Sequence, residues 1–277
     1  MEFFLCPICK QHFSRRDHSL VCPEGHSFDI ARRGYVNLLR PGKVGAVRHG
    51  DDRLMVDARR AFLDAGFYAP LRDAVTDIVC AMAPSGSAIT VLDAGCGEGY
   101  YTAAVKRALE SMGTAVSAYG IDVSRDALNA CAVRDRAIRL AVASIFDLPA
   151  ENESVDVLLN LFAPYDAAEF ARVLKMGGTL VRAFPRERHL WDLKAAIYDE
   201  PYENEILSTE LDGFAKVTET ALDFPLHLET SEQIMNLFRM TPYYYKTSRE
   251  GQARAQALPK LETHASFRLL VYQKVKK

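Results

Sequence analysis

The sequence predicts an α/β protein with a parallel, doubly wound sheet, preceded by a small metal-binding segment. Two observations carry this prediction. From residue 89 onwards, apolar runs that suit strands alternate with segments that suit helices. Before them, cysteine and histidine residues with the spacing of metal ligands lie within the first 26 residues. A length of 277 residues suits one large domain with a small one.

The composition is that of an ordinary globular protein, with 49% hydrophobic and 25% charged residues. No apolar run reaches the roughly 18 residues that a membrane-spanning helix needs. The first residues lack the basic start and long apolar core of a signal peptide. We therefore expect no contact with a membrane and a cytoplasmic location.

The net charge of −2 is unevenly distributed along the chain. Residues 1–60 contain 11 Lys and Arg against 7 Asp and Glu, and residues 246–277 contain 8 against 2. The middle of the chain is left with 15 basic against 27 acidic residues. A polyanionic partner is thus expected to touch the ends, although solvated surface charge explains the pattern equally well.

The N-terminal segment has the pattern of a zinc site. Cys6-Pro-Ile-Cys9 and Cys22-Pro-Glu-Gly-His26 form two short knuckles, which together supply the four ligands of a tetrahedral Cys3His site. Four protein ligands leave no open position, so the zinc is expected to be structural and to stabilise a segment too short for its own core. His12 and His18 lack the mirrored knuckle. The other cysteines are expected to be buried free thiols: Cys80, Cys96 and Cys131.

The predicted division of the chain is a zinc-binding segment over 1–39, a linker over 40–53 and a catalytic body over 54–277. The linker is rich in glycine and charge. Two helices, over about 54–65 and 69–82, open the body. Tyr68 lies between them, where it either covers the ligand site or belongs to the core.

The remaining elements complete a seven-stranded sheet whose last two strands form an antiparallel hairpin. Strands are expected over 89–93, 117–122, 138–143, 155–162, 179–184, 217–224 and 265–275. Helices are expected over 100–112, 124–135, 166–174 and 189–198. In such a sheet the ligand lies at the carboxyl ends of the strands.

The first of these strands ends in Asp93 and breaks into Gly95, Gly97 and Gly99, with Glu98 between the last two. A strand, a tight glycine turn and a helix allow the backbone to approach a bound nucleotide closely. The spacing differs from the Gly-x-Gly-x-x-Gly of dinucleotide sites. The leading acidic residue instead resembles motif I of class I S-adenosylmethionine (SAM)-dependent methyltransferases, with a nicotinamide enzyme as the alternative.

Polar residues at the ends of later strands suit the same ligand. Asp122 could accept hydrogen bonds from both ribose hydroxyls, or could cap the following helix together with Ser124. Ser144 follows the third strand, where an adenine edge would be contacted. Asn160 begins an Asn-x-x-x-Pro-Tyr run at the end of the fourth strand and is a candidate for touching either the cofactor or the acceptor.

A family resemblance is carried by the zinc pattern together with residues 34–39, 50–73, 95–102, 188–190 and 240–242. Through these segments the chain closely resembles the RlmA-type methyltransferases, which modify N1 of a guanine in ribosomal RNA. The resemblance implies a Rossmann-like class I methyltransferase fold, zinc held by Cys6, Cys9, Cys22 and His26, SAM contacts through Tyr68, Gly97, Glu98 and His189, methylation of a 23S rRNA hairpin, and a homodimer. Without the resemblance, His189 would be interpreted as a helix cap or surface residue.

Two other functions remain open at this point. One is a class I methyltransferase acting on another RNA or on a small molecule, with a purely structural zinc module. The other is a non-catalytic RNA-binding protein that retains SAM for stability. The aromatic and basic residues of 243–260 suit RNA binding, but also suit an aromatic hinge packed on the sheet.

Overall fold

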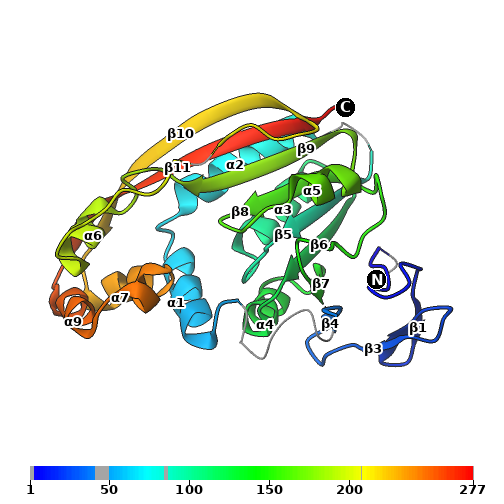
Figure 1. The fold of residues 1–277 in the computed structure, drawn as a ribbon, viewed down its shortest axis with the longest axis horizontal. Coiled ribbons are helices and arrows are strands. Elements are labelled where there is room, and N and C mark those ends of the chain that lie inside the picture. Colours follow the sequence, from blue (N-terminus) through cyan, green and yellow to red (C-terminus); the bar gives the residue numbers. More distant parts are fainter. Residues whose placement is uncertain (1–2, 41–49, 84–86, 207, 277) are drawn as a thin grey trace.

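The computed structural model describes residues 3–40, 50–83, 87–206 and 208–276. It contains a large mixed sheet with helices on both faces and a small sheet near the N-terminus (Figure 1). The large sheet has the order β10-β11-β9-β8-β5-β6-β7-β4. Its strands are β4 (Val36–Asn37), β5 (Ile89–Ala94), β6 (Val116–Asp122), β7 (Arg139–Val142), β8 (Val155–Leu161), β9 (Leu174–Pro185), β10 (Phe214–Leu228) and β11 (Leu261–Lys274).

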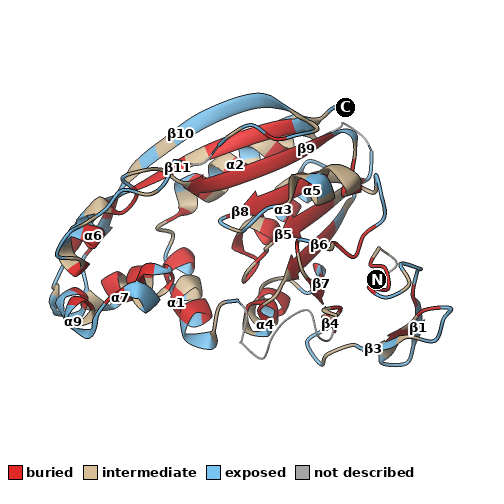
Figure 2. Cartoon of the chain, viewed as in Figure 1, coloured by how far each residue is buried: buried red, intermediate tan, exposed pale blue. Residues whose placement is uncertain are grey.

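Six neighbouring strands of this sheet, from β4 to β9, run parallel, and β11 and β10 are added antiparallel. The central strands are buried because both of their faces are covered, whereas β10 is exposed along most of its length (Figure 2). The predicted doubly wound α/β class is confirmed. The predicted linker falls largely on residues 41–49, which lie outside the described residues.

Within the described ranges the large sheet has eight strands, so the prediction of seven was wrong by one. The extra strand, β4, comes from the N-terminal segment and pairs with the outer edge of β7, with Val36 opposite Ala141 and Asn37 opposite Val142. The N–H of Leu38 then donates to the carbonyl of Val142 at 2.8 Å. An edge strand presents unpaired backbone groups, and β4 satisfies those of β7. Two residues are too few for a recognisable sequence pattern.

The last two strands are antiparallel as predicted, but they do not form a hairpin. Three helices connect them: α7 (Ser231–Arg239), α8 (Tyr243–Lys246) and α9 (Arg249–Ala257). Helix α7 begins where Thr230 Oγ1 accepts a hydrogen bond from the N–H of Gln233 at 3.2 Å. It buries Ile234, Leu237 and Phe238 at helical spacing. The aromatic stretch 243–246 is thus helical, with Tyr243 buried and Tyr245 exposed.

The other helices lie within two residues of the predicted bounds. They are α1 (Arg53–Asp64), α2 (Ala69–Met82), α3 (Tyr100–Ser111), α4 (Arg125–Arg134), α5 (Ala167–Val173) and α6 (Trp191–Ile197). Helices α1, α2, α3, α6, α7 and α9 share one apolar core with one face of the sheet. Helix α5 contributes to the core on the opposite face. None of the helices in the described ranges has the length and apolar character needed to cross a bilayer.

The N-terminal module, residues 3–39, covers part of the face of the large sheet on which α5 lies. It contains an antiparallel sheet of β1 (Ser14–Arg16), β2 (Ser19–Val21) and β3 (Ser27–Asp29). Phe4 is fully buried, and the Phe3 ring stacks on Tyr119 of β6 with centroids 4.0 Å apart. Lys10 forms an ion pair with Asp147 of the body. The module is therefore held by the core that it shares with the body as well as by its own metal cluster.

Candidate functional site

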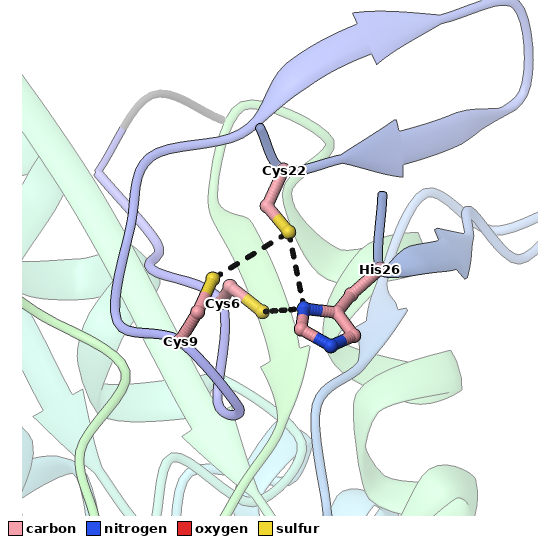
Figure 3. Close-up of side chains that lie close together, drawn as sticks. All are labelled: Cys6, Cys9, Cys22 and His26. Carbon is pink, nitrogen blue, oxygen red and sulfur yellow. Dashed lines mark hydrogen bonds between the residues drawn. The ribbon is translucent and has the colours of Figure 1, made fainter. Parts of the chain in front are cut away.

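The metal cluster of the N-terminal module is formed by the four predicted ligands. Their donor atoms all lie within 4.8 Å of one another (Figure 3). Cys22 Sγ is 3.5 Å from Cys9 Sγ and 3.2 Å from His26 Nδ1, while Cys6 Sγ is 3.7 Å from the same nitrogen. Zinc–sulfur bonds of about 2.3 Å and a zinc–nitrogen bond of about 2.0 Å place tetrahedral donors roughly 3.5–3.8 Å apart. The donor set fits one structural zinc ion.

Two tight turns bring these ligands together. The N–H of Lys10 donates to the carbonyl of Cys6 at 2.8 Å, which folds the first knuckle. In the second knuckle Gly25 has φ +80°, and its N–H donates to the carbonyl of Cys22 at 2.9 Å. His12 takes no part in the cluster and instead contacts Glu151 of the body at 2.7 Å.

The glycine-rich loop after β5 lies where the sequence predicted a ligand. A Cβ at Gly95 (φ +97°) would be 2.5 Å from Ala163 Cβ, and a Cβ at Gly99 (φ +81°) would be 2.4 Å from Cys131 Sγ. These two glycines thus allow close packing against the loop after β8 and against α4. At Gly97 (φ +54°) the nearest atom to an added Cβ is Arg59 Nη1 at 3.9 Å, so here the left-handed backbone is the constraint.

The two predicted acidic residues occupy different environments. Asp93 is 2% exposed, and its Oδ2 accepts a hydrogen bond from Thr102 Oγ1 at 2.5 Å. Its Oδ1 has no partner among the described residues, and burial raises the pKa of this carboxyl to about 7. Asp122 accepts from the N–H of Gly97 at 2.9 Å and from the N–H of Ser124 at 2.8 Å. It therefore joins the glycine loop to the start of α4.

The alternative prediction for Asp122 was that it caps the following helix together with Ser124. In the structure Ser124 is the N-cap of α4, and its Oγ accepts a hydrogen bond from the N–H of Ala127 at 3.1 Å. The end of β7 lies beside Asp122, because the N–H of Ala143 donates to its carbonyl at 3.2 Å. Ser144 follows there, half-buried. Its Oγ accepts from the N–H of Phe146 at 3.2 Å.

The Glu98 side chain is 2% exposed and faces α4. Its Oε2 accepts a hydrogen bond from Arg134 Nε at 2.7 Å, and its Oε1 has no partner among the described residues. Burial raises the pKa of this carboxyl despite the neighbouring guanidinium. The side chain thus fixes the glycine loop to α4.

Tyr68 and His189, 121 residues apart, form a buried pair. The ring nitrogen His189 Nδ1 accepts a hydrogen bond from the N–H of Ser266 at 3.1 Å. Burial lowers the pKa of His189 to about 3, so the ring is neutral and its other nitrogen, Nε2, carries the proton. That nitrogen lies 3.4 Å from the Tyr68 hydroxyl, and Phe267 packs against both rings. His189 is therefore neither a helix cap nor a surface residue.

Asn160 is 1% exposed and uses its side chain inside the protein. Its Nδ2 donates to the carbonyl of Ala94 at 3.1 Å and to that of Pro164 at 2.9 Å. Its Oδ1 lies 3.4 Å from Arg182 Nε, which can donate to it. These contacts join the end of β5 to the loop after β8.

Comparisons with known proteins agree with both halves of this arrangement. A family profile described as "RlmA, N-terminal" matches residues 4–42, and a profile described as "Methyltransferase domain" matches residues 91–178. The 23S rRNA (guanine(748)-N(1))-methyltransferase of Streptomyces fradiae is 37% identical over 199 residues, covering 71% of this chain and 68% of that protein. The chain belongs to the RlmA-type 23S rRNA guanine-N1 methyltransferase family.

Two further relatives of the RlmA type carry provisional names for the same reaction. The YxjB protein of Bacillus subtilis (strain 168) is 34% identical over 203 residues, covering 72% of this chain and 70% of that protein. A protein of Micromonospora griseorubida is 39% identical over 209 residues, covering 68% of this chain and 67% of that protein. In this family the methyltransferase part uses SAM and the N-terminal ribbon holds zinc.

The residues of this RlmA-family chain fit SAM. The cofactor carries cationic groups and a ribose diol. The site offers a buried Asp93 oxygen that has no partner within the described part of the chain, and a second carboxyl group, that of Asp122, at the end of the next strand. The open side of Gly97 leaves room for a close approach to the backbone. Asp93 and Asp122 therefore place two carboxyl groups at the carboxyl ends of the neighbouring strands β5 and β6.

Arg59 is a further residue beside the cofactor loop, and it lies within the run 50–73 that carries the family resemblance. Its guanidinium pairs with Asp51, donates to the carbonyl of Met240 at 3.0 Å and lies beside Gly97. It joins the entry to α1 and the turn after α7 to the cofactor loop. Its position on α1 gave no signal, because the contact with the loop depends on how α1 packs.

Proposed function

We propose that this protein transfers a methyl group from SAM to N1 of a guanine in a hairpin of 23S rRNA. The observation that carries the proposal is a zinc ribbon of the RlmA type built into the same sheet whose strand ends carry a glycine-rich cofactor loop. An RNA-contacting module and a methyl-donor site are thereby held in one fixed relation.

In this proposal the cofactor site is formed by the residues at the carboxyl ends of β5, β6 and β7 together with the buried pair from the start of α2 and the loop after β9. These residues are Tyr68, Asp93, Gly95, Gly97, Glu98, Asp122, Ser144 and His189. Bound SAM supplies an activated methyl group on its sulfonium. The protein then has to hold the acceptor nitrogen in line, which accounts for much of the rate.

N1 of a neutral guanine carries a proton that must leave during methylation. His189 is a poor acceptor for it, because its Nδ1 already accepts from Ser266 and its Nε2 lies against Tyr68. Asn160 carries no basic group, and both ends of its amide are used inside the protein. We propose that Asn160 is a positioning residue, which holds the loop after β8 against the cofactor loop.

The RNA backbone is proposed to contact the zinc ribbon over residues 1–39. All four of its arginines are exposed: Arg15, Arg16, Arg32 and Arg33. Arginine side chains are common partners of phosphate oxygens. A cytoplasmic location follows if ribosomal RNA is the substrate. The homodimer implied by the family resemblance is proposed as the working assembly.

The test is methyl transfer from labelled SAM to 23S rRNA that lacks its native modification. The expected product blocks primer extension at one guanine, because a methyl group on N1 prevents base pairing. A protein that binds SAM and methylates a metabolite, but leaves every 23S rRNA guanine unmodified, would refute the proposal. A protein that binds both SAM and rRNA without transfer would support a non-catalytic role instead.

A further inference from the structure

Phe162 stands out at the carboxyl end of β8. It has φ +60°, in the left-handed region that bulky side chains avoid, and its side chain is 44% exposed although it follows a buried strand. A strained, exposed aromatic residue beside a ligand site calls for an explanation in terms of function. Neither the fold nor the cofactor site described above requires a large apolar ring at this position.

The backbone of Phe162 is fixed relative to the methyl-donor loop. Its N–H donates to the carbonyl of Ala183 at 2.9 Å. Asn160, two residues earlier, holds both the carbonyl of Ala94 and that of Pro164. The next residue, Ala163, packs so closely on Gly95 that a Cβ there would be 2.5 Å away. The Phe162 backbone is thus held beside the start of the cofactor loop by the contact of Asn160 with Ala94 and by the packing of Ala163 on Gly95.

The ring is supported by other aromatic residues and remains partly open to solvent. It meets Phe267 with centroids 5.3 Å apart and Tyr101 with centroids 6.3 Å apart. Phe267 in turn packs against His189 at 4.7 Å. This packing supports the ring, and the 44% exposure leaves surface for a further planar group.

The position of Phe162 relative to the sheet indicates which planar group stacks on its ring. The order of the central strands is β8-β5-β6-β7. Asp122 and Ser144, the proposed ribose and adenine contacts, follow β6 and β7 on one side of the cofactor loop. Phe162 follows β8 on the other side, which leaves it for the acceptor.

We propose that the Phe162 ring is the surface on which the target guanine stacks when its N1 faces the methyl donor. An enzyme that modifies N1 must take the guanine out of its pair, because N1 is a pairing atom, and an exposed aromatic ring stabilises such an unpaired base. Stacking is tolerant of base identity, so Phe162 positions the base and does not select guanine. This inference rests on the proposed function.

The test compares Phe162→Leu with Phe162→Trp and with Tyr202→Leu. Leucine keeps an apolar side chain but removes the stacking face, whereas tryptophan keeps the face. Tyr202 is a matched control, because its aromatic side chain is 46% exposed and belongs to neither the cofactor loop nor the loop after β8. Thermal denaturation establishes that each variant is folded, and calorimetry gives its SAM affinity.

For Phe162→Leu we expect kcat/KM for rRNA to fall roughly 5- to 150-fold, the effect of losing one base stack. SAM affinity should stay within about twofold of wild type. Phe162→Trp should retain most of the activity, and Tyr202→Leu should behave as wild type. With an RNA whose target nucleotide is abasic, wild type and Phe162→Leu should bind equally well, because no base remains to stack.

Two results would overturn the inference alone: unchanged kcat/KM in Phe162→Leu, or an affinity loss of the same size on intact and abasic RNA. Weakened SAM binding in Phe162→Leu would assign the ring to the cofactor and would also overturn it. A wild-type protein that methylates no 23S rRNA would refute the proposed function, and the stacking inference with it.

Discussion

Replacing Asp93 with asparagine should make the stability of the SAM-free protein less dependent on pH. Asp93 is 2% exposed, and burial raises the pKa of its carboxyl from 3.8 to about 7. In the unfolded chain the same carboxyl ionises near pH 4. Between these two pH values the unfolded state releases a proton that the folded state retains, so the wild-type protein loses stability as the pH rises.

The size of the effect follows from the pKa. One pH unit corresponds to about 1.4 kcal/mol for a group that is protonated in only one of the two states. From pH 5 to the folded pKa of about 7 there are two such units. The free energy of unfolding of wild type should therefore fall by about 3 kcal/mol relative to Asp93→Asn between pH 5 and pH 8.

The variant keeps an oxygen that can accept from Thr102, and any cost of its amide group is the same at both pH values. The measurement is urea denaturation of zinc-loaded, SAM-free protein at pH 5 and pH 8. Asp212→Asn, at an exposed position, is the matched control and should follow wild type. Equal pH dependence of wild type and Asp93→Asn would refute the argument that burial keeps the Asp93 carboxyl protonated in the folded protein.

Three further substitutions probe the rest of the structure. Cys9→Ser should abolish zinc binding and lower the melting temperature of the whole chain, because the ribbon shares a core with the sheet. Metal analysis measures the zinc content and calorimetry the melting temperature, and an unchanged melting temperature would contradict the prediction. Gly95→Ala should weaken SAM binding at least about tenfold, whereas Gly113→Ala, with similar φ but no atom within 4 Å, should cost only stability. Asp122→Ala should weaken SAM binding roughly 5- to 150-fold by calorimetry, with Asp212→Ala unchanged.

Most of the secondary structure was predictable, because its signals are local. Strand–helix alternation, the glycine turn and the capping residues each involve a few neighbouring residues, and the structure places these elements within a few residues of the predicted bounds. The exceptions are the four short N-terminal strands, β1 to β4, and the three helices between β10 and β11. A two-residue strand has no pattern of its own, and it exists because the edge of β7 needs a partner.

The ligands of the metal cluster were predictable because their sequence signal is local as well. Two knuckles with fixed ligand spacing already determine that four donors can meet, and the structure brings them within 4.8 Å of one another. The sequence did not reveal that this module also seals one face of the methyltransferase sheet through Phe3 and Phe4. Buried apolar contacts between distant segments have no short-range signature.

The cofactor site, too, was predictable only where its signals are local. By itself the sequence determined that a glycine loop follows a strand ending in Asp93 and that Asp122 ends the next strand. Only the tertiary structure decided that His189 meets Tyr68, that Asn160 turns inward, and that Phe162 is held open beside the loop. The physical reason is that a side chain's role depends on its burial and partners, and here those partners lie tens to more than a hundred residues away along the chain.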